Sequence, residues 1–389
     1  MSQNIATMQA LVLSNINELR LCQIPYPKTG NYSVLIKVSA VGICGTDFHI
    51  FSGIANYNTN KQGHPIALTQ QPQVLGHEIV GVVVEVGKEV RDLRIGDRVV
   101  IDQGLNCWSQ QQSLCEYCTS EDSHQCQYYR EHGITGLAGG FAEYISIPAV
   151  NAICIKSGLD DDVQAALTEP LGCIIHAEAR VAKTRTRYAL SSLDNWRQAQ
   201  SVLIFGAGPA GLLFIQYLRN VQKYEGLLLV SEPNPIKQKL AVEFGAEVTD
   251  ASGNDLVEIV QEKTKGRLIE YVIDACGAGT VMASLSRLIR KQATVLLYGY
   301  GHAGVDLSIL NNLQFLEATL ICSAGASGGF DGDLRPTTYR KALELITTKQ
   351  IEVASWITHR YPSLKSLSAV FNGEYRDRNY IKGVLTLKE

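Results

Sequence analysis

The run Gly206-Ala207-Gly208-Pro209-Ala210-Gly211 constrains the fold more than any other part of the chain. It follows the short apolar run Ser201–Phe205, which predicts a strand, and it precedes residues with helical spacing. The G-x-G-x-x-G spacing allows a tight turn, a close backbone approach and close packing of a helix on a strand. The helix N-terminus then presents free N–H groups and the positive end of a dipole. We therefore predict a βαβ unit that binds a dinucleotide, with a purely structural glycine turn as the alternative.

An acidic residue follows at the distance that this unit requires. Glu232 comes about 20 residues after Gly211, at the end of the apolar run Leu227–Val230. A carboxylate there accepts hydrogen bonds from both hydroxyls of an adenosine ribose and repels a 2′-phosphate. The pattern favours NAD over NADP, and Lys237, which can reach the same ribose, moderates that preference.

The distribution of strands predicts an α/β fold with a second, β-rich part. After about residue 172, strands expected at Tyr271–Asp274 and Thr294–Gly299 alternate with helical segments such as Ile236–Phe244, which predicts a doubly wound parallel sheet. The first half instead contains β-branched runs separated by glycine. Its strands are expected at Val34–Val38, Ile79–Gly87 and Arg98–Ile101, and the tail adds a helix at Tyr339–Thr347 and a strand at Gly383–Leu387.

Composition excludes several classes of protein. A chain of 389 residues is long enough for two domains with sizeable cores. Its net charge of −3 gives no reason to expect a nucleic-acid partner. It has no apolar run of about 18 residues and no N-terminal signal pattern, so we expect no membrane partner and a cytoplasmic location.

Four cysteines form a separate pattern. Cys107, Cys115, Cys118 and Cys126 follow a C-x7-C-x2-C-x7-C spacing on a stretch without regular periodicity. Four thiolates on a short loop suit a closed, tetrahedral structural zinc site, and free thiols are the alternative. The remaining cysteines outside the metal patterns are interpreted as small buried apolar side chains: Cys22, Cys154, Cys173, Cys276 and Cys322.

A second set of residues offers mixed metal ligands. Cys44 lies in Gly-Ile-Cys-Gly-Thr-Asp, His77 and Glu78 in Gly-His-Glu, and Glu169 in Thr-Glu-Pro. One thiolate, one imidazole and one carboxylate are ligands that catalytic zinc accepts, and three protein ligands leave one position open. Whether Glu78 or Glu169 is the third ligand stays open at this point.

These motifs, in this order, resemble the zinc-dependent medium-chain dehydrogenases, which include alcohol, sorbitol and threonine dehydrogenases. The resemblance covers nearly the whole chain and also includes Gly96-Asp97-Arg98-Val99 and Gly139-Gly140-Phe141-Ala142-Glu143-Tyr144. It implies a GroES-like catalytic domain of residues 1–172 and 323–389 and a Rossmann NAD-binding domain of residues 173–322. It also implies about two zinc ions per chain, NAD as cofactor, and a homodimer or homotetramer, with Thr319–Cys322 as the edge strand between subunits.

The resemblance implies reversible oxidation of an alcohol to a carbonyl. Zinc would lower the pKa of the alcohol, and hydride would pass to the nicotinamide. Thr46 would accept the alcohol proton and relay it to His49, while Glu78 is expected at the metal. Asp47 is interpreted as a partner of the ligands, and Lys382 as either a contact of the cofactor phosphates or a solvated residue.

The substrate is less constrained than the reaction. Glu169, where liver-type alcohol dehydrogenases carry a cysteine, favours a polyol, sugar alcohol or cyclitol. An L-threonine 3-dehydrogenase-like enzyme and a non-catalytic NAD-binding relative are the alternatives. Segments 56–73 and 183–200 are longer than usual for the family, and residues 110–114 are extra residues in the cysteine loop. The basic residues near 183 are interpreted as a solvated helix face or an anion site: Arg180, Lys183, Arg185 and Arg187.

Overall fold

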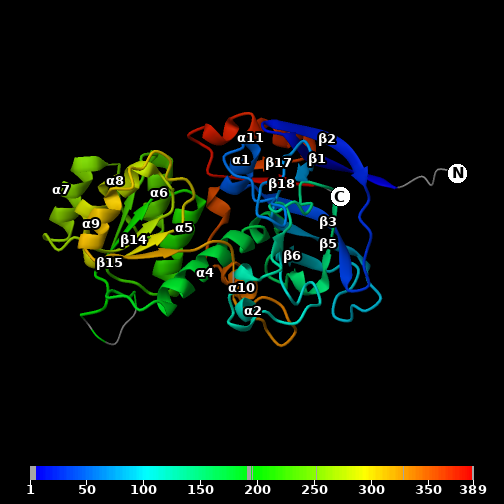
Figure 1. Ribbon diagram of the computed structural model, residues 1–389, viewed down its shortest axis with the longest axis horizontal. Helices are drawn as coiled ribbons and strands as arrows, with labels where there is room; N and C mark the ends of the chain where they lie inside the picture. Colours follow the sequence, from blue (N-terminus) through cyan, green and yellow to red (C-terminus); the bar gives the residue numbers. More distant parts are fainter. Residues whose placement is uncertain (1–5, 191–193, 195, 251, 327, 388–389) are drawn as a thin grey trace. The chain divides into compact units, whose positions relative to one another are not determined.

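The chain folds into two units in this computed structural model, which describes residues 6–190, 194, 196–250, 252–326 and 328–387. One unit contains residues 1–172, 326–349 and 353–389, and the other contains residues 173–325 and 350–352. Figure 1 shows the two units with the chain coloured from blue to red. Within the described residues, no helix is both long enough and apolar enough to cross a membrane.

The first unit is built on mainly antiparallel sheets, in which β17 and β18 pair parallel. Its largest sheet has the order β10-β6-β5-β3-β18-β17, and β9 also pairs with β3. The strands of this sheet are β3 (Ser33–Gly42), β5 (Glu78–Val86), β6 (Arg98–Ile101), β9 (Tyr144–Pro148), β10 (Ala152–Cys154), β17 (Ile357–Tyr361) and β18 (Lys382–Thr386). The smaller sheets are β2-β1-β4, with β1 (Thr7–Asn15), β2 (Glu18–Pro25) and β4 (Gln73–Val74), and the pair β7 (Gly104–Leu105) and β8 (Arg130–Glu131).

The C-terminal tail belongs to this first unit because β18 pairs with β3. The unit's helices are short, apart from α4 and α10. The boundary between the two units falls inside α4. They are α1 (Gly45–Phe51), α2 (Glu116–Thr119), α3 (Asp162–Ala165), α4 (Thr168–Lys183), α10 (Thr337–Thr347) and α11 (Ser368–Phe371). One apolar core, which includes Ile36, Val41, Ile79 and Phe141, packs between the sheets and the tail.

The second unit has a single six-stranded sheet in the order β13-β12-β11-β14-β15-β16, with every neighbouring pair parallel. The predicted doubly wound α/β fold is therefore confirmed. Strands β11, β14 and β12 are almost completely buried, as expected for a parallel sheet covered on both faces. The strands are β11 (Ser201–Phe205), β12 (Leu227–Ser231), β13 (Glu247–Thr249), β14 (Ile269–Asp274), β15 (Ile289–Leu297) and β16 (Thr319–Cys322).

Helices α5 to α9 connect these strands and cover the sheet, as the green and yellow ribbons of Figure 1 show. Helix α7 packs on α8 and α8 on α9, whereas α5 packs on α6. Their bounds are α5 (Pro209–Gln216), α6 (Pro235–Glu243), α7 (Gly253–Lys263), α8 (Gly279–Leu288) and α9 (Ile309–Phe315). Strand β15 begins five residues before the expected Thr294, because its first part carries polar side chains that an apolar pattern does not reveal.

Candidate functional site

Two neighbouring strands of the first unit bring Cys44, His77 and Glu78 together. Strand β3 ends at Gly42 and β5 begins at Glu78, and the antiparallel register pairs these two residues. Cys44 therefore leaves the sheet beside the point where His77 enters it. One ligand atom from each of the three side chains lies within 4.8 Å of the other two.

Asp47 fixes the two loops that carry these ligands. Its carboxylate accepts a hydrogen bond from the Cys44 N–H at 2.9 Å and another from the Gly76 N–H at 3.1 Å. Asp47 is fully buried, and its Oδ1 lies 3.5 Å from Nδ1 of His77. The side chain lies beside the ligand residues and holds their backbones, which is the interpretation that the sequence favoured.

The group favours positive charge. Burial of the His77 imidazole lowers its pKa, but Asp47 and Cys44 outweigh that effect and hold the pKa well above its ordinary value. A metal cation competes with protons for the same anionic surroundings. The electrostatic setting that favours a proton on His77 therefore also favours a bound cation.

The donor atoms fit zinc. Nδ1 of His77 and Oε2 of Glu78 are buried, and neither has a hydrogen-bond partner among the described residues. Buried polar atoms without partners are costly, and a metal ion would satisfy both. Gly42 makes room for the carboxylate, since a Cβ at this position would lie 1.8 Å from Glu78 Oε2. Thiolate, imidazole and carboxylate together are ligands of catalytic zinc.

Lys382 is the unexpected member of this site. Its Nζ donates hydrogen bonds to Glu78 Oε1 at 2.6 Å and to the carbonyl oxygen of Ile43 at 2.9 Å. Burial lowers the pKa of Lys382, but Glu78 and Cys44 raise it above its ordinary value. The interpretation of Lys382 as a solvated residue is wrong, because the side chain is buried against Glu78.

Glu169 lies beside the three-residue group rather than in it. It occupies the first turn of α4, where the helix dipole favours a carboxylate. Its Oε1 accepts a hydrogen bond from Gln103 Nε2 at 3.1 Å, and its charge contributes to the raised pKa of Lys382. Glu78 is thus the glutamate nearer to Cys44 and His77. Glu169 is close enough to interact electrostatically with Lys382.

Helix α1 carries the two residues expected to relay the proton. Cys44 is the N-cap of this helix, and its Sγ lies 3.7 Å from Oγ1 of Thr46. His49 lies in the last turn and is half-buried, and this burial lowers the pKa of its imidazole. At neutral pH His49 is therefore largely neutral, as a proton acceptor must be.

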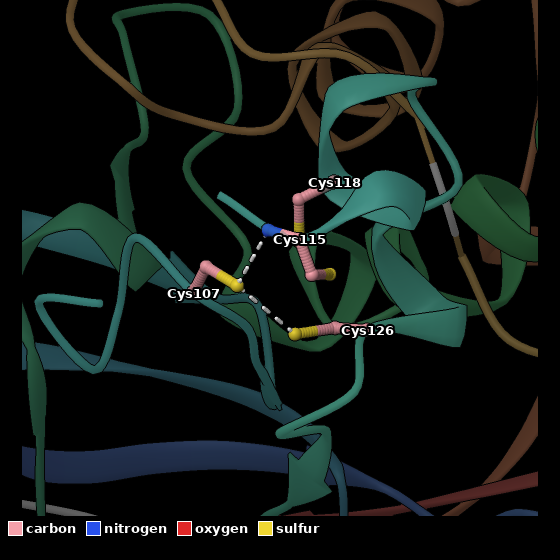
Figure 2. A group of neighbouring side chains, drawn as sticks. All are labelled: Cys107, Cys115, Cys118 and Cys126. Carbon is pink, nitrogen blue, oxygen red and sulfur yellow. Dashed lines mark hydrogen bonds between the residues drawn. The ribbon is translucent and has the colours of Figure 1, made fainter. Parts of the chain in front are cut away.

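The cysteine quartet converges on one point. Figure 2 shows Cys107, Cys115, Cys118 and Cys126 turned toward one another, and all four side chains are buried. Sγ of Cys107 lies 3.5 Å from Sγ of Cys126 and accepts a hydrogen bond from the Cys115 N–H. Although burial opposes ionisation, the N–H groups of Cys118 and Gln127 help to lower the pKa of Cys115 to about 6. Four converging thiols with one favoured thiolate fit a tetrahedral zinc site.

The glycine motif forms the expected turn in the second unit. Gly206 follows β11 with φ of +91°, a conformation that favours glycine, and Gly208 caps α5. Pro209 is the first residue of that helix and Ala210 the second. At Gly211 a Cβ would lie 2.0 Å from the carbonyl oxygen of Gly206, so only glycine permits this close packing.

Glu232 connects the end of β12 to the glycine turn. Its carboxylate accepts hydrogen bonds from the N–H groups of Ala207 at 2.7 Å and Asn234 at 2.8 Å. The side chain is therefore held beside the turn, where the sequence placed a ribose. Lys237 lies in the first turn of α6 and is partly buried.

Two sequence interpretations outside the site need correction. Of the cysteines expected to be buried, only Cys173 is; Cys22 and Cys154 are half-buried, and Cys276 and Cys322, which lie at or just after the ends of strands β14 and β16, are exposed. The basic residues do not share one helix face, since α4 ends at Lys183, before Arg185. Gln103 was missed altogether: a lone amide two residues after a strand carries no sequence signal.

Two family models match the chain. The model described as the alcohol dehydrogenase GroES-like domain matches residues 30–157. The model described as zinc-binding dehydrogenase matches residues 209–348. The two matches cover most of the first unit's sheet and most of the second unit.

Curated relatives align along almost the whole chain. L-galactonate-5-dehydrogenase of Escherichia coli K12 is 29% identical over 384 residues, covering 98% of this chain and 100% of that protein. L-threonine 3-dehydrogenase of Thermococcus kodakarensis is 30% identical over 352 residues, covering 90% of each chain.

Solved structures share the fold. A protein described as a zinc-binding dehydrogenase from Sinorhizobium meliloti 1021, bound to NADP, has a TM-score of 0.75 and 27% identity, covering 98% of this chain and 99% of that one. A protein described as an alcohol dehydrogenase from Escherichia coli CFT073, complexed with NADH, has a TM-score of 0.78 and 24% identity, covering 98% and 100%.

Proposed function

The chain belongs to the zinc-dependent medium-chain dehydrogenase family, and from this premise we propose that it oxidises a polyhydroxy alcohol with NAD at the Cys44–His77–Glu78 site. As a member of this family, the chain is an NAD(P)-linked zinc alcohol dehydrogenase. The observation that carries the site assignment is the buried group in which Nδ1 of His77 and Oε2 of Glu78 lack hydrogen-bond partners among the described residues.

Each unit has its own role in this proposal. Residues 1–172 and 323–389 would form the GroES-like catalytic domain, and residues 173–322 would form the Rossmann domain that binds the nucleotide, except that residues 323–325 and 350–352 pack with the second unit. The parallel sheet and the glycine turn support the second assignment. The metal-ligand groups of the first unit support the first.

Cys44 and His77 would hold the catalytic zinc with one glutamate. Glu78 is nearer, but Lys382 holds one of its oxygens, which leaves Glu169 as a competing ligand. When bound, zinc supplies a Lewis acid that lowers the pKa of the substrate alcohol. The quartet Cys107, Cys115, Cys118 and Cys126 would hold the structural zinc.

The chain's own residues would move the proton. Thr46 adjoins the ligand Cys44 and would accept the proton of the alcohol, and His49 would take it onward toward solvent. The lowered pKa of His49 supports this role, because the imidazole stays neutral to a lower pH than usual.

NAD is the preferred cofactor in this proposal. Glu232 places a carboxylate beside the glycine turn formed by Gly206, Gly208, Pro209, Ala210 and Gly211, where it would accept bonds from the ribose hydroxyls and repel a 2′-phosphate. Lys237 lies in the next helix and would reduce the discrimination.

The substrate class rests on two considerations. Glu169 adds a carboxylate at the site, as in the polyol-type members of the family. One relative that aligns along almost the whole chain, L-galactonate-5-dehydrogenase, is named for a polyhydroxy acid. L-Threonine is the second candidate substrate, supported by the relative that is named L-threonine 3-dehydrogenase.

We place the enzyme in the cytoplasm as a homodimer or homotetramer. All ten cysteines are free in the structure, which supports a reducing compartment. Strand β16 is one of the two edges of the parallel sheet, and an unpaired edge can pair with the same edge of a second copy.

A substrate panel tests the proposal. NADH formation would be measured with polyols, inositols, sugar acids and L-threonine, before and after removal of metal by a chelator. We expect turnover of a polyhydroxy substrate that falls to background without metal and returns with zinc. Turnover that survives complete metal removal would overturn the zinc assignment, and turnover of L-threonine alone would select the second candidate.

A further inference from the structure

We propose that Gln103 is a positioning residue that couples the cysteine lobe, residues 104–131, to Glu169. The proposal rests on the proposed role of Glu169 at the catalytic zinc. The quartet would then do more than hold its own loop, because the lobe would also fix the position of the Glu169 carboxylate at the reaction centre.

Gln103 lies at the junction of three elements of the first unit. It precedes β7, and its side chain is almost completely buried. Its Oε1 accepts a short hydrogen bond from the hydroxyl of Tyr339 in α10. Its Nε2 donates to Glu169 Oε1 at 3.1 Å and lies 3.4 Å from Glu131 Oε1.

These partners fix the orientation of the amide. Ionised carboxylates only accept hydrogen bonds, so the amide nitrogen must face Glu169 and Glu131. The amide oxygen then faces Tyr339, whose hydroxyl donates to it. A neutral side chain with two N–H groups thus holds two carboxylates at a set separation without neutralising either of them.

The chain of contacts continues into the cysteine lobe. Glu131, in β8, accepts a hydrogen bond from the hydroxyl of Tyr129 at 2.8 Å. That hydroxyl lies 2.8 Å from Nδ1 of His124, and the Tyr129 ring packs against the four cysteines. His124 and Tyr129 lie two and three residues from Cys126, so a change in the quartet moves both.

The position of Glu169 therefore depends on the structure of the cysteine lobe. With the lobe closed around its metal, Tyr129 and Glu131 hold the amide of Gln103, and the amide holds Glu169. With the contact at Tyr129 broken, Glu169 loses its fixed position while its own helix and the ligands Cys44 and His77 remain in place. Partners that orient metal-site groups typically change metal affinity or activity by about 10- to 100-fold when they are removed.

The test compares variants at increasing distance from Glu169 in the full-length, zinc-loaded enzyme. Gln103→Ala removes the amide, Tyr129→Phe removes only the hydroxyl in the lobe, and Glu131→Gln keeps an oxygen that can accept from Tyr129. Tyr128→Phe is the matched control, since Tyr128 is the neighbouring residue and its side chain is exposed.

Two readouts distinguish positioning from a structural role. The first is the rate at which zinc is released to a chromophoric chelator. The kinetic phase that is missing in a Cys44→Ser variant is the one that reports release from the catalytic site. The second is the split between kcat and KM for NAD. We expect Gln103→Ala to speed that release phase and lower kcat by about 10-fold, and Tyr129→Phe to do both by about 3-fold, with KM for NAD unchanged. Glu131→Gln and Tyr128→Phe should resemble the wild type.

Glu169→Gln distinguishes failure of the coupling through Gln103 from failure of the role proposed for Glu169. If it changes zinc release and kcat but Gln103→Ala and Tyr129→Phe do not, the coupling is overturned and the proposed function stands. If Glu169→Gln leaves both readouts unchanged, the role of Glu169 in the proposed function fails, and the coupling fails with it. Should Gln103→Ala not fold, Tyr129→Phe alone decides, because it removes a single oxygen atom.

Discussion

Lys382 and Glu78 place a full ion pair in the interior of the first unit, next to the candidate zinc ligands. Both side chains are almost completely buried, and Nζ and Oε1 are 2.6 Å apart. Removing two charges from water is costly, and their attraction offsets the cost only when further hydrogen bonds complete the geometry. Ile43 supplies one such acceptor for Nζ. The lysine thus balances a site in which Cys44, Glu78 and Glu169 are all potential anions.

Replacing Lys382 by Met should destabilise the metal-free enzyme more than the zinc-loaded one. An unpaired buried carboxylate costs about 3–5 kcal/mol, and a bound cation would partly neutralise Glu78 in place of the lysine. Thermal unfolding with and without chelator measures the difference, and Lys382→Arg, which keeps the charge, is the control. An equal loss of stability in both states would contradict the charge-balance argument.

The pH dependence of this pair has a definite sign. The folded-state pKa of Lys382 is raised above its ordinary value, so the stability from the pair is fully present below the unfolded lysine pKa. It is lost as the pH rises through the folded pKa. The pair therefore predicts a loss of stability on the alkaline side, above the unfolded lysine pKa.

Glu178 is the opposite case, a buried carboxyl that accepts its hydrogen bond from a neutral hydroxyl rather than from a cation. Burial raises its pKa to about 7, and the hydroxyl of Tyr271, 2.8 Å away, lowers it in part. Because the folded pKa lies above the unfolded one, the neutral acid favours folding below about pH 4.5, and this contribution is lost as the pH rises through about 7.

Glu178→Gln should therefore be more stable than the wild type at pH 8 and nearly equal to it at pH 5. The amide keeps an acceptor for Tyr271 but cannot ionise. The difference between the two pH values should be about 2–3 kcal/mol in the free energy of unfolding, measured by urea titration. Glu258→Gln, on an exposed position of α7, is the matched control and should show no such change.

At the scale of elements, the cysteine lobe contains only short pieces of regular structure. Its strands β7 and β8 have two residues each and its helix α2 has four. Such short elements bury too little apolar surface to be stable alone, and a structural zinc supplies the missing energy in small modules.

Cys115→Ser should loosen this lobe without unfolding the sheet of the first unit. We expect zinc content to fall by about one ion per chain and amide hydrogen exchange to rise across residues 104–131, while β3 and β5 stay protected. Mass spectrometry of both quantities checks this. Cys22→Ser, in the same unit but outside the quartet, should leave both unchanged; a wild-type exchange pattern in Cys115→Ser would mean that the lobe needs no metal.

The elements that the sequence predicted share one property. Strands β6 and β11 are continuous apolar runs bounded by turn residues, so their periodicity and ends are both visible. Strands β4, β7 and β8 have only two residues, which is too short to show any period. Their position depends on pairing with distant strands, as when Leu13 in β1 meets Gln73.

The same limit applies to the site. Cys44, His77 and the cysteine quartet have ligand chemistry and spacing that can be recognised locally. Lys382 and Gln103 do not, because their roles depend on contacts with Glu78, 304 residues away, and with Tyr339, 236 residues away. A single sequence records such contacts only after folding has brought the residues together.

At the scale of the whole molecule, the edge of the parallel sheet is the surface that most needs a partner. Strand β16 has only β15 as a neighbour in the sheet. Exposed apolar side chains lie on this strand, on helix α9 before it, and just ahead of that helix: Leu320 at 38%, Leu310 at 45%, Phe315 at 82% and Leu307 at 73%. An unpaired edge combined with exposed apolar residues marks an interaction surface, and a second copy paired about a two-fold axis would cover both.

Leu320→Asp should therefore break the β16 interface, converting a homodimer to monomers or a homotetramer to dimers. The substitution puts a charge on an exposed position of β16, where two copies would otherwise bury their side chains, and repulsion between the two symmetric charges adds to the desolvation cost. Sedimentation velocity measures the mass. Ile95→Asp is the matched control, because Ile95 is 70% exposed but belongs to the first unit, so its substitution should leave the oligomer intact. If Leu320→Asp sediments as the wild type does, subunits associate through another surface, and the exposed residues of α9 and β16 must be explained without a second copy.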